Sequence, residues 1–308
     1  MKYRKLGKTG LRASIIGLGA GGPSRLGQRT GGSEDNSVSL IREALGMGIN
    51  LVDTAESYNT EGLIGRAIGG FDRESIILST KKFTIETPEP GEVRRSLERS
   101  LEALGTDHVD LYHLHAVYPE KYEVLVEDIY PELESLRDEG SIRFIGITEH
   151  FNRDPEHSML KDAVRDGLWD VVMVGFNILN QSAGPVLEEA RRRGIGTLVM
   201  FAVRRALSDP VRLREVLEGM VSRNELDPGD IDMEEPLGFL SGDGQAGIID
   251  AAYRFCRDAP GVDVVLSGTG SIEHLRANVD SFSGPPLRRE QLERLRRVFR
   301  KSRTETGE

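Results

Sequence analysis

Four side chains that can move protons follow three of the apolar runs in this sequence. Asp53 and Tyr58 come at and just after the end of one run, Lys81 ends the next, and His115 ends the third. A phenol is a weak acid with an ordinary pKa near 10, and a neighbouring ammonium group lowers that pKa because it stabilises the phenolate. A carboxylate such as Asp53 holds the ammonium in place. These residue types predict a proton-donor site if the fold gathers them.

The elements that must position them alternate between two periodicities. Eight short runs rich in Val and Ile have the near-continuous hydrophobicity of strands buried on both faces. They are Ser14–Gly19, Ile49–Asp53, Ile76–Thr80, Val109–His115, Ile142–Ile147, Val171–Val174, Thr197–Phe201 and Val262–Leu266. Segments of helical spacing lie between them, the clearest at Glu92–Leu104. Eight strand–helix units predict an α/β fold, a (β/α)₈ TIM barrel, in which chemistry belongs at the ends of the strands.

We expect one barrel domain over residues 1–301. The stretch 224–247, between the seventh and eighth strands, is acidic and contains Pro and Gly, so it is interpreted as a long insertion without a core of its own. Residues 288–301 have the pattern of an extra C-terminal helix. Residues 302–308 are expected to form a disordered tail.

Composition narrows the class of function. The 40 Lys and Arg residues oppose 50 Asp and Glu, which gives a net charge of −10. Such a surface repels phosphate backbones, so nucleic acid is not an expected partner. The single cysteine excludes an internal disulfide and fits a reducing cytoplasm. No apolar run is long enough to cross a membrane. We therefore expect a cytoplasmic protein that acts on a small molecule; the sequence leaves its oligomeric state open.

A metal-dependent hydrolase is an alternative. His113 and His115 project from the same face of a strand, and His-x-His is also a metal-ligand spacing in barrel hydrolases. His150 could then supply a third ligand. In those hydrolases, however, the pair closes the first strand rather than the fourth. We expect no metal, and we expect His113 to be a buried, hydrogen-bonded histidine.

The chain resembles the aldo-keto reductases in several motifs that occur in order along nearly its whole length. The similar segments are Met1–Leu11, which matches an N-terminal β-hairpin, Asp53–Tyr58, Ser79–Lys81, Asp110–His115, Ile142–Thr148 and Gly268–Ser271 leading to Asn278. The resemblance implies an NAD(P)(H)-dependent oxidoreductase that interconverts an alcohol and a carbonyl such as an aldehyde, ketone or sugar. Tyr58 would exchange the proton, Lys81 paired with Asp53 would lower its pKa, and His115 would orient the carbonyl. A nucleotide-binding sensor subunit of the same fold, with little turnover, is the alternative.

The same resemblance implies a cofactor site. Gly19 lies in a glycine-rich loop that no helix follows directly, so this loop fits a position beneath the nicotinamide better than a Rossmann fingerprint. Phe201 would stack on the nicotinamide, and the loops after the seventh and eighth strands would hold the phosphates. The full set is Gly19, Thr148, Glu149, Asn177, Phe201, Ala202, Val203, Arg204, Gly268, Thr269, Gly270, Ser271, His274 and Asn278.

Some positions depart from the family pattern. Thr148-Glu149 replaces a common Ser-Asn pair, Met173 replaces a Gln, and Ala116 replaces the aromatic residue that often follows the catalytic histidine. Gly268 and His274 stand where Lys and Arg commonly grip the 2′-phosphate of NADP, although Arg276 or Arg204 could substitute. The sequence therefore leaves open NADP or NAD as the cofactor, the substrate and the reaction direction.

Overall fold

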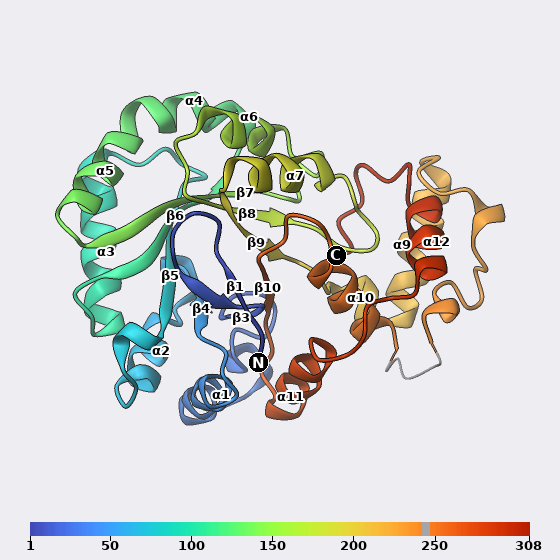
Figure 1. The fold of residues 1–308 in the computed structure, drawn as a ribbon, viewed down its shortest axis with the longest axis horizontal. Coiled ribbons are helices and arrows are strands. Elements are labelled where there is room, and N and C mark those ends of the chain that lie inside the picture. Colours follow the sequence, from blue (N-terminus) through green and yellow to red (C-terminus); the bar gives the residue numbers. More distant parts are fainter. Residues whose placement is uncertain (242–246) are drawn as a thin grey trace.

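Eight parallel strands close into a barrel in the computed structural model, which describes residues 1–241 and 247–308 (Figure 1). Each strand pairs with the next one along the chain, and the last pairs back with the first. The strands are β3 (Ile16–Gly19), β4 (Leu51–Asp53), β5 (Ile77–Phe83), β6 (Val109–Val117), β7 (Ile142–Glu149), β8 (Val171–Gly175), β9 (Gly196–Met200) and β10 (Val264–Ser267). The predicted barrel is confirmed.

Helices follow every strand and surround the barrel. In α3 (Pro90–Leu104), Val93 and Leu97 are buried, and Gly105 ends the helix in a left-handed conformation with φ 66°. The others are α1 (Glu34–Gly46), α2 (Glu61–Ile68), α4 (Tyr122–Val124), α5 (Tyr130–Asp138), α6 (Ser158–Asp166), α7 (Gly184–Arg193), α8 (Arg205–Ser208), α9 (Pro210–Ser222), α10 (Ile248–Arg257), α11 (Ile272–Ser281) and α12 (Arg289–Val298). No helix of the described residues is long and apolar enough to span a membrane.

An N-terminal hairpin closes one end of the barrel. Strands β1 (Tyr3–Lys5) and β2 (Arg12–Ser14) pair antiparallel and cross the barrel in dark blue in Figure 1. Leu6, Leu11 and Ala13 are buried there, in one cluster with residues from the starts and interior of the barrel strands. The hairpin confirms the expectation from the family resemblance. It leaves the opposite end, where the strands finish, open for chemistry.

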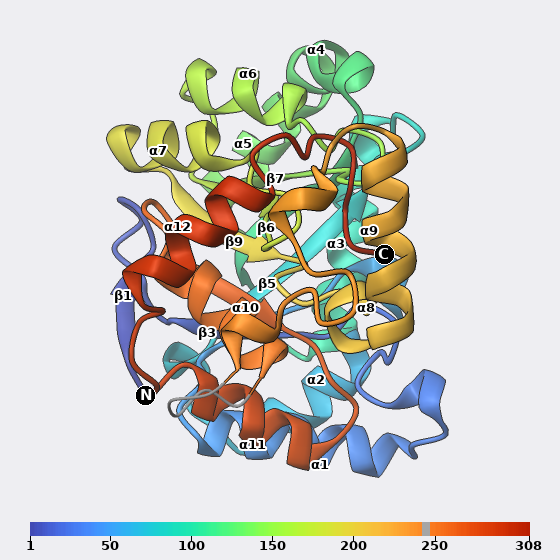
Figure 2. The same cartoon turned by 90° about the vertical axis from the view of Figure 1, so that its right-hand side faces the viewer.

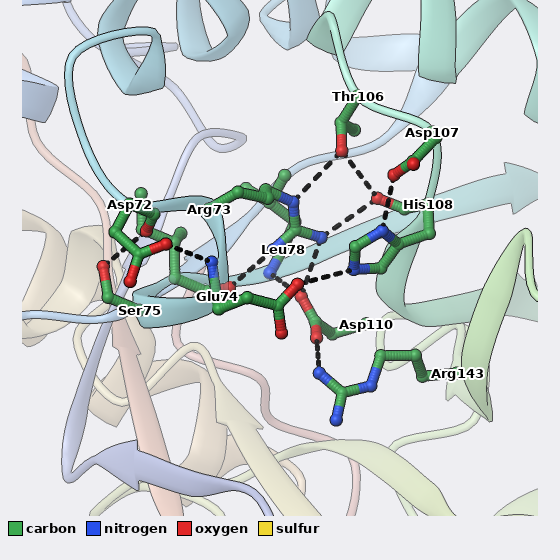
Figure 3. A network of polar contacts seen from close by, with 11 residues as sticks. Asp72, Arg73, Glu74, Ser75, Leu78, Thr106, Asp107, His108, Asp110 and Arg143 are labelled. Atoms are coloured by element: carbon green, nitrogen blue, oxygen red, sulfur yellow. Dashed lines mark hydrogen bonds and ion pairs between the residues drawn. The ribbon is translucent and has the colours of Figure 1, made fainter.

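A buried carboxylate fastens three strands together near the hairpin end (Figure 3). Asp110 at the start of β6 is 1% exposed and accepts hydrogen bonds from the main chain of Leu78 on β5 (2.9 Å) and from Arg73 (3.0 Å). Its other oxygen accepts from Arg143 on β7 at 2.8 Å. Asp110 belongs to the family-like motif that ends in His115, but its contacts are those of a structural residue.

The expected insertion shares its core with the rest of the molecule. Between α9 and α10 the chain forms the short helices η6 (Pro228–Asp230) and η7 (Gly238–Leu240). Its apolar side chains Leu226, Ile231, Leu237 and Leu240 are buried in the main core, and Gln291 of α12 donates to the carbonyl of Phe239 at 3.0 Å. This segment and α9, α10 and α12 cover the side of the molecule that faces the viewer in Figure 2. Residues 242–246 of the insertion lie outside the described residues.

The last seven residues differ from the expected disordered tail. Residues 302–308 lie against the loops that follow β8 and α9, and the chain end lies beside α9 (Figure 2). The amide of Asn177 donates to the carbonyl of Thr306 at 3.2 Å, and the carboxylate of Glu225 accepts from the main-chain amide of Arg303 at 2.9 Å. The partners are buried polar side chains distant in sequence. For that reason, the local sequence of this segment contains no apolar pattern that predicts an ordered conformation.

Candidate functional site

Tyr58 and His115 meet at the carboxyl end of the strands. Tyr58 ends a short 3₁₀ turn, η2 (Glu56–Tyr58), that follows β4, and His115 lies near the end of β6. The hydroxyl of Tyr58 is 3.2 Å from Nε2 of His115, and the two rings meet edge to face with centres 5.5 Å apart. Two residues 57 positions apart in the chain thus share one hydrogen bond at the rim where the sequence placed both of them.

Lys81 and Asp53 form a buried ion pair beside this phenol. The ammonium nitrogen of Lys81 is 2.7 Å from Oδ2 of Asp53, with side-chain exposures of 0% and 5%. The hydroxyl of Ser79 donates to the other oxygen of Asp53 at 2.7 Å. Lys81 Nζ lies 5.3 Å from the centre of the Tyr58 ring. The four side chains singled out by type are therefore brought together, and Lys81, not Lys82, points to the phenol.

The electrostatics of the pair differ from the expectation. Burial, reinforced by the charge of Asp53, raises the pKa of Tyr58, and the guanidinium of Arg25 acts in the opposite direction. The net direction is therefore opposite to the decrease expected from Lys81. Burial also lowers the pKa of Lys81 itself, and Asp53 opposes that decrease.

His115 is a neutral imidazole in this setting. Burial lowers its pKa well below the ordinary value, and the charges of Lys81, His113 and His150 act in the same direction. Its Nδ1 is buried and has no hydrogen-bond partner among the described residues. A neutral ring with Nε2 at the Tyr58 hydroxyl can exchange a hydrogen bond with a carbonyl or hydroxyl placed beside it.

His113 is buried as expected, but it is not hydrogen-bonded as expected. Both ring nitrogens lack a partner within the described part of the chain. The ring lies over Gly146 of β7, where an added Cβ would come within 2.1 Å of Nδ1. Residues 1–241 and 247–308 contain no cluster of three or more His, Cys, Asp or Glu side chains that could hold a metal ion.

Two residues near Tyr58 were not selected from the sequence. A Cβ at Gly21 would lie 2.5 Å from Cε2 of Tyr58, so only glycine lets the phenol ring take this position. Arg25 donates a hydrogen bond from Nη1 to the main-chain carbonyl of Tyr58 at 2.9 Å. Their only sequence signal is their place in the loop after β3, because the contact partner lies more than thirty residues away.

The candidate phosphate loop follows β10. Ser271 caps the N-terminus of α11 by accepting from the amide of His274 at 3.2 Å, and Thr269 accepts from the amide of Ser271 at 3.1 Å. Gly268 lies against Gly19, because an added Cβ would be 3.1 Å from the Gly19 carbonyl. An added Cβ at Gly270 would be 2.6 Å from the Cα of Gly27. The side chain of His274 is exposed, and Asn278 donates to Ser267 at 2.9 Å.

The loop after β9 is covered by the C-terminal segment. The Arg204 guanidinium lies 4.2 Å from the centre of the Phe201 ring, forms an ion pair with Glu308 and donates to Asn152 at 2.7 Å. Ala202 is buried and Val203 partly buried between them. Phe201 and Arg204 are therefore in contact with each other, and the carboxylate of Glu308 is already bound to the guanidinium of Arg204.

Three further residues that were expected to bind the cofactor are buried. Thr148 is buried and accepts from the main-chain amide of Ala116 at 2.9 Å. Glu149 is also buried: one of its oxygens accepts from the amide of Gly175 (2.7 Å), and the other contacts Nδ1 of His157 (2.9 Å). Asn177 uses its amide on the carbonyls of Phe201 and Thr306. Asn177 and Glu149 thus hold loops in place, and the hydrogen bonds of Glu149 go to Gly175 and His157 rather than to Tyr58 or Lys81.

The chain matches known proteins over its whole length. The model of the aldo/keto reductase family matches residues 16–300. The NADH-specific methylglyoxal reductase of Escherichia coli (strain K12) is 26% identical over 314 residues, which cover 92% of this chain and 94% of that one. L-galactose dehydrogenase of Arabidopsis thaliana is 36% identical over 162 residues, which cover 48% of each chain. The holo form of aldo-keto reductase AKR11C1 from Bacillus halodurans matches 100% of this chain and 99% of its own, with a TM-score of 0.74 and 25% identity.

The barrel, the hairpin that closes it and the match over nearly all residues agree with one another. Members of this family use NAD(P)H and act on small carbonyl compounds. The chain belongs to the aldo/keto reductase family and is an oxidoreductase of that type.

Proposed function

We propose that this protein interconverts a small carbonyl compound and its alcohol with NADH as the preferred cofactor, and that Tyr58 exchanges the proton. The observation that carries this proposal is the hydrogen bond between Tyr58 and His115 beside the buried pair of Lys81 and Asp53. The group faces the end of the barrel at which the capped helix α11 begins. The alternative of a sensor subunit with little turnover has no observation in its favour.

The residues present fit a nicotinamide dinucleotide at two places. The first turn of a helix leaves amide groups without intrahelical partners, and Ser271 places the start of α11 at the strand ends, where a phosphate binds favourably. Next to Tyr58, Nδ1 of His115 is a buried polar atom without a partner among the described residues. At a third place the fit requires a rearrangement, since Arg204 must leave Glu308 before it can contact a phosphate.

The chemistry divides between the cofactor and the chain. A bound nicotinamide supplies or accepts the hydride. Tyr58 donates its hydroxyl proton to the carbonyl oxygen during reduction and takes a proton back, as phenolate, during alcohol oxidation. His115 hydrogen-bonds the same oxygen and fixes its position, because its Nε2 lies at the Tyr58 hydroxyl. Lys81 and Asp53 form the rigid, charge-balanced support beside the phenol ring.

The charges around α11 favour NADH over NADPH. Arg276, one candidate to grip a 2′-phosphate, is bound by Glu43 at 2.7 Å, and Arg204, the other, is bound by Glu308. Glu273 adds a carboxylate that accepts from the Ser271 hydroxyl at 2.7 Å. A dianionic phosphate would meet paired arginines and additional carboxylates here. The relative from Escherichia coli, whose name specifies NADH, points the same way.

A binding titration tests the cofactor preference. We expect NADH to bind at least about tenfold more tightly than NADPH, a difference of about 1.4 kcal/mol. Glu43→Gln frees Arg276 and should reduce the ratio. Quenching of protein fluorescence by each nucleotide gives both dissociation constants. Tighter binding of NADPH by the unaltered protein would overturn the assignment.

A substitution tests the catalytic assignment. Tyr58→Phe removes only the exchangeable proton, so it should lower kcat for carbonyl reduction by about a hundredfold or more while NADH affinity stays within about twofold. Tyr253→Phe, which removes a hydroxyl that contacts Ser267, is a matched control on another buried tyrosine. Equal activity of Tyr58→Phe and wild type would refute the role of Tyr58. Tight NADH binding without turnover of any carbonyl by the wild type would favour the sensor.

A further inference from the structure

Arg25 forms a hydrogen bond with the main chain of Tyr58, the proposed proton donor. Its Nη1 donates to the carbonyl of Tyr58 at 2.9 Å, and its guanidinium carbon lies 5.8 Å from the centre of the Tyr58 ring. Tyr58 is the last residue of η2, and its own amide donates to the carbonyl of Ala55 at 3.0 Å. The following residue, Asn59, is in the left-handed region with φ 58°. Arg25 therefore holds the end of a sharp turn whose direction sets where the phenol points.

The loop that carries Arg25 is strained and firmly anchored. Arg25 and Leu26 have φ values of 44° and 56°, a left-handed conformation that is uncommon for residues other than glycine. Such strain persists where surrounding contacts impose it. Leu26 is 1% exposed, and its carbonyl accepts from the hydroxyl of Ser37 at 2.7 Å. Gly27 packs against Gly270 of the candidate phosphate loop. These anchors on both sides fix the place of Arg25.

The charges that face Tyr58 come from four elements. Asp53 ends β4, Lys81 lies on β5, His115 lies on β6 and Arg25 lies in the loop after β3. Asp53 and Lys81 are bound to each other, and burial keeps His115 neutral. Within the described residues, Arg25 makes no ion pair with a carboxylate. Arg25 therefore brings a second positive charge, besides that of Lys81, close to Tyr58.

We propose that Arg25 is a positioning residue for the reaction: it fixes the main chain of Tyr58 and stabilises the phenolate that Tyr58 becomes when it gives up its proton. The inference rests on the proposed function in assigning the proton exchange to Tyr58. It adds a residue of the strained loop to Lys81, which is bound to Asp53, as a second cation beside Tyr58. Because Gly27 joins that loop to the start of α11, the same segment contacts both the proton donor and the candidate phosphate site.

A titration of the phenol itself tests this without turnover. The tyrosine at position 58 is replaced by 3,5-difluorotyrosine, which ionises at lower pH than tyrosine and whose phenolate absorbance is read directly in the full-length protein. Arg25→Gln removes the charge but keeps an amide donor for the Tyr58 carbonyl. We expect it to raise the pKa of the fluorinated phenol by about one pH unit, the effect of losing one charge about 6 Å away at an effective dielectric constant of about 40.

Two further variants make the result specific. Arg25→Lys keeps the charge, so its pKa increase should be less than half that of Arg25→Gln. Arg29→Gln neutralises an exposed arginine of the same loop and should leave the pKa unchanged. In alcohol oxidation, the rise of kcat/KM with pH should move to higher pH by the same amount in Arg25→Gln, while the dissociation constant of NADH stays within about twofold.

The outcomes separate the two proposals. An unchanged phenol pKa in Arg25→Gln, or an equal increase in Arg29→Gln, overturns the role of Arg25 whether or not the protein reduces a carbonyl. A raised phenol pKa in a protein that turns over no carbonyl supports the role of Arg25 at the phenol and refutes only the proposed function. If Arg25→Gln does not fold, the kinetic and pKa comparison of Arg25→Lys with wild type decides: a shift of a full unit on retaining the charge contradicts the proposal.

Discussion

Removing the carboxylate of Asp53 should destabilise the protein severely, because it leaves a charge in the interior. In Asp53→Asn the ammonium of Lys81, which is fully buried, loses its partner at 2.7 Å. Its remaining contact is the carbonyl of Thr54 at 2.5 Å. Breaking a buried pair by removing one partner costs about 3–5 kcal/mol, since the other charge stays uncompensated. We expect a loss of unfolding free energy in that range at neutral pH.

The loss should depend on pH with a definite sign. Burial already lowers the pKa of Lys81, and Asp53 is the largest influence that opposes this decrease. Without Asp53 the folded-state pKa of Lys81 decreases further, while the unfolded value stays near 10.5. Between the two values the unfolded state binds more protons, so the stability of Asp53→Asn increases with pH in that window. The difference from wild type should shrink as the pH rises toward 10.5 and be largest below the folded-state pKa.

Urea unfolding, followed by circular dichroism at several pH values, provides the measurement. The double variant Asp53→Asn with Lys81→Met has no buried charge at this place and should recover part of the loss. Glu188→Gln, which breaks an exposed pair with Arg191, is the control and should cost less than about 1 kcal/mol. The reasoning is refuted if Asp53→Asn costs no more than this control, or if the double variant is less stable than Asp53→Asn.

Three other substitutions have expected outcomes. Gly21→Ala places a Cβ where the Tyr58 ring lies, so the ring must move. We expect kcat for carbonyl reduction to decrease by about tenfold or more while the affinity for NADH is unchanged. An unchanged kcat would show that the ring moves without loss of activity. Glu308→Gln releases Arg204 from an ion pair whose carboxylate is largely exposed. Fluorescence titration should then show that NADH binds about two- to fivefold more tightly. Weaker NADH binding would mean that the Glu308 carboxylate helps to form the site. Asp110→Asn leaves two arginines without their buried partner and should cost about 3 kcal/mol of unfolding free energy with KM unchanged; a change in KM with full stability would contradict its structural role.

Periodicity and residue type were sufficient to predict the barrel and to place Asp53, Tyr58, Lys81 and His115 at one rim of it. Strands buried on both faces have a continuous apolar pattern, and a closed parallel barrel puts all strand ends at one rim. Tyr58 follows such a strand, and Lys81 and His115 lie near the ends of theirs, so their convergence depended only on the closure of the barrel. The sequence predicted a lowered pKa for Tyr58, whereas burial and the charge of Asp53 both act to raise it in the folded protein.

The surroundings of the site required the tertiary structure. Glu149 matched a motif position, yet its side chain turns to His157 and the amide of Gly175, which are set by the packing of other loops. The segment 302–308 has no apolar pattern, and its order comes from Asn177 and Glu225, more than seventy residues away along the chain. The local sequence of a segment cannot predict contacts with residues that come close to it only in the folded chain.

By itself, then, the order of residues predicted the alternation of strands and helices, and it placed four candidate side chains at the end of the barrel where the strands finish. These properties follow from hydrophobic periodicity and chain direction, which each segment contains within itself. Which charges are cancelled, which arginines are free to meet a phosphate, and that Arg25 lies on Tyr58 were decided only when distant segments packed together. Electrostatic effects depend on distance and burial, and neither exists before the chain has folded.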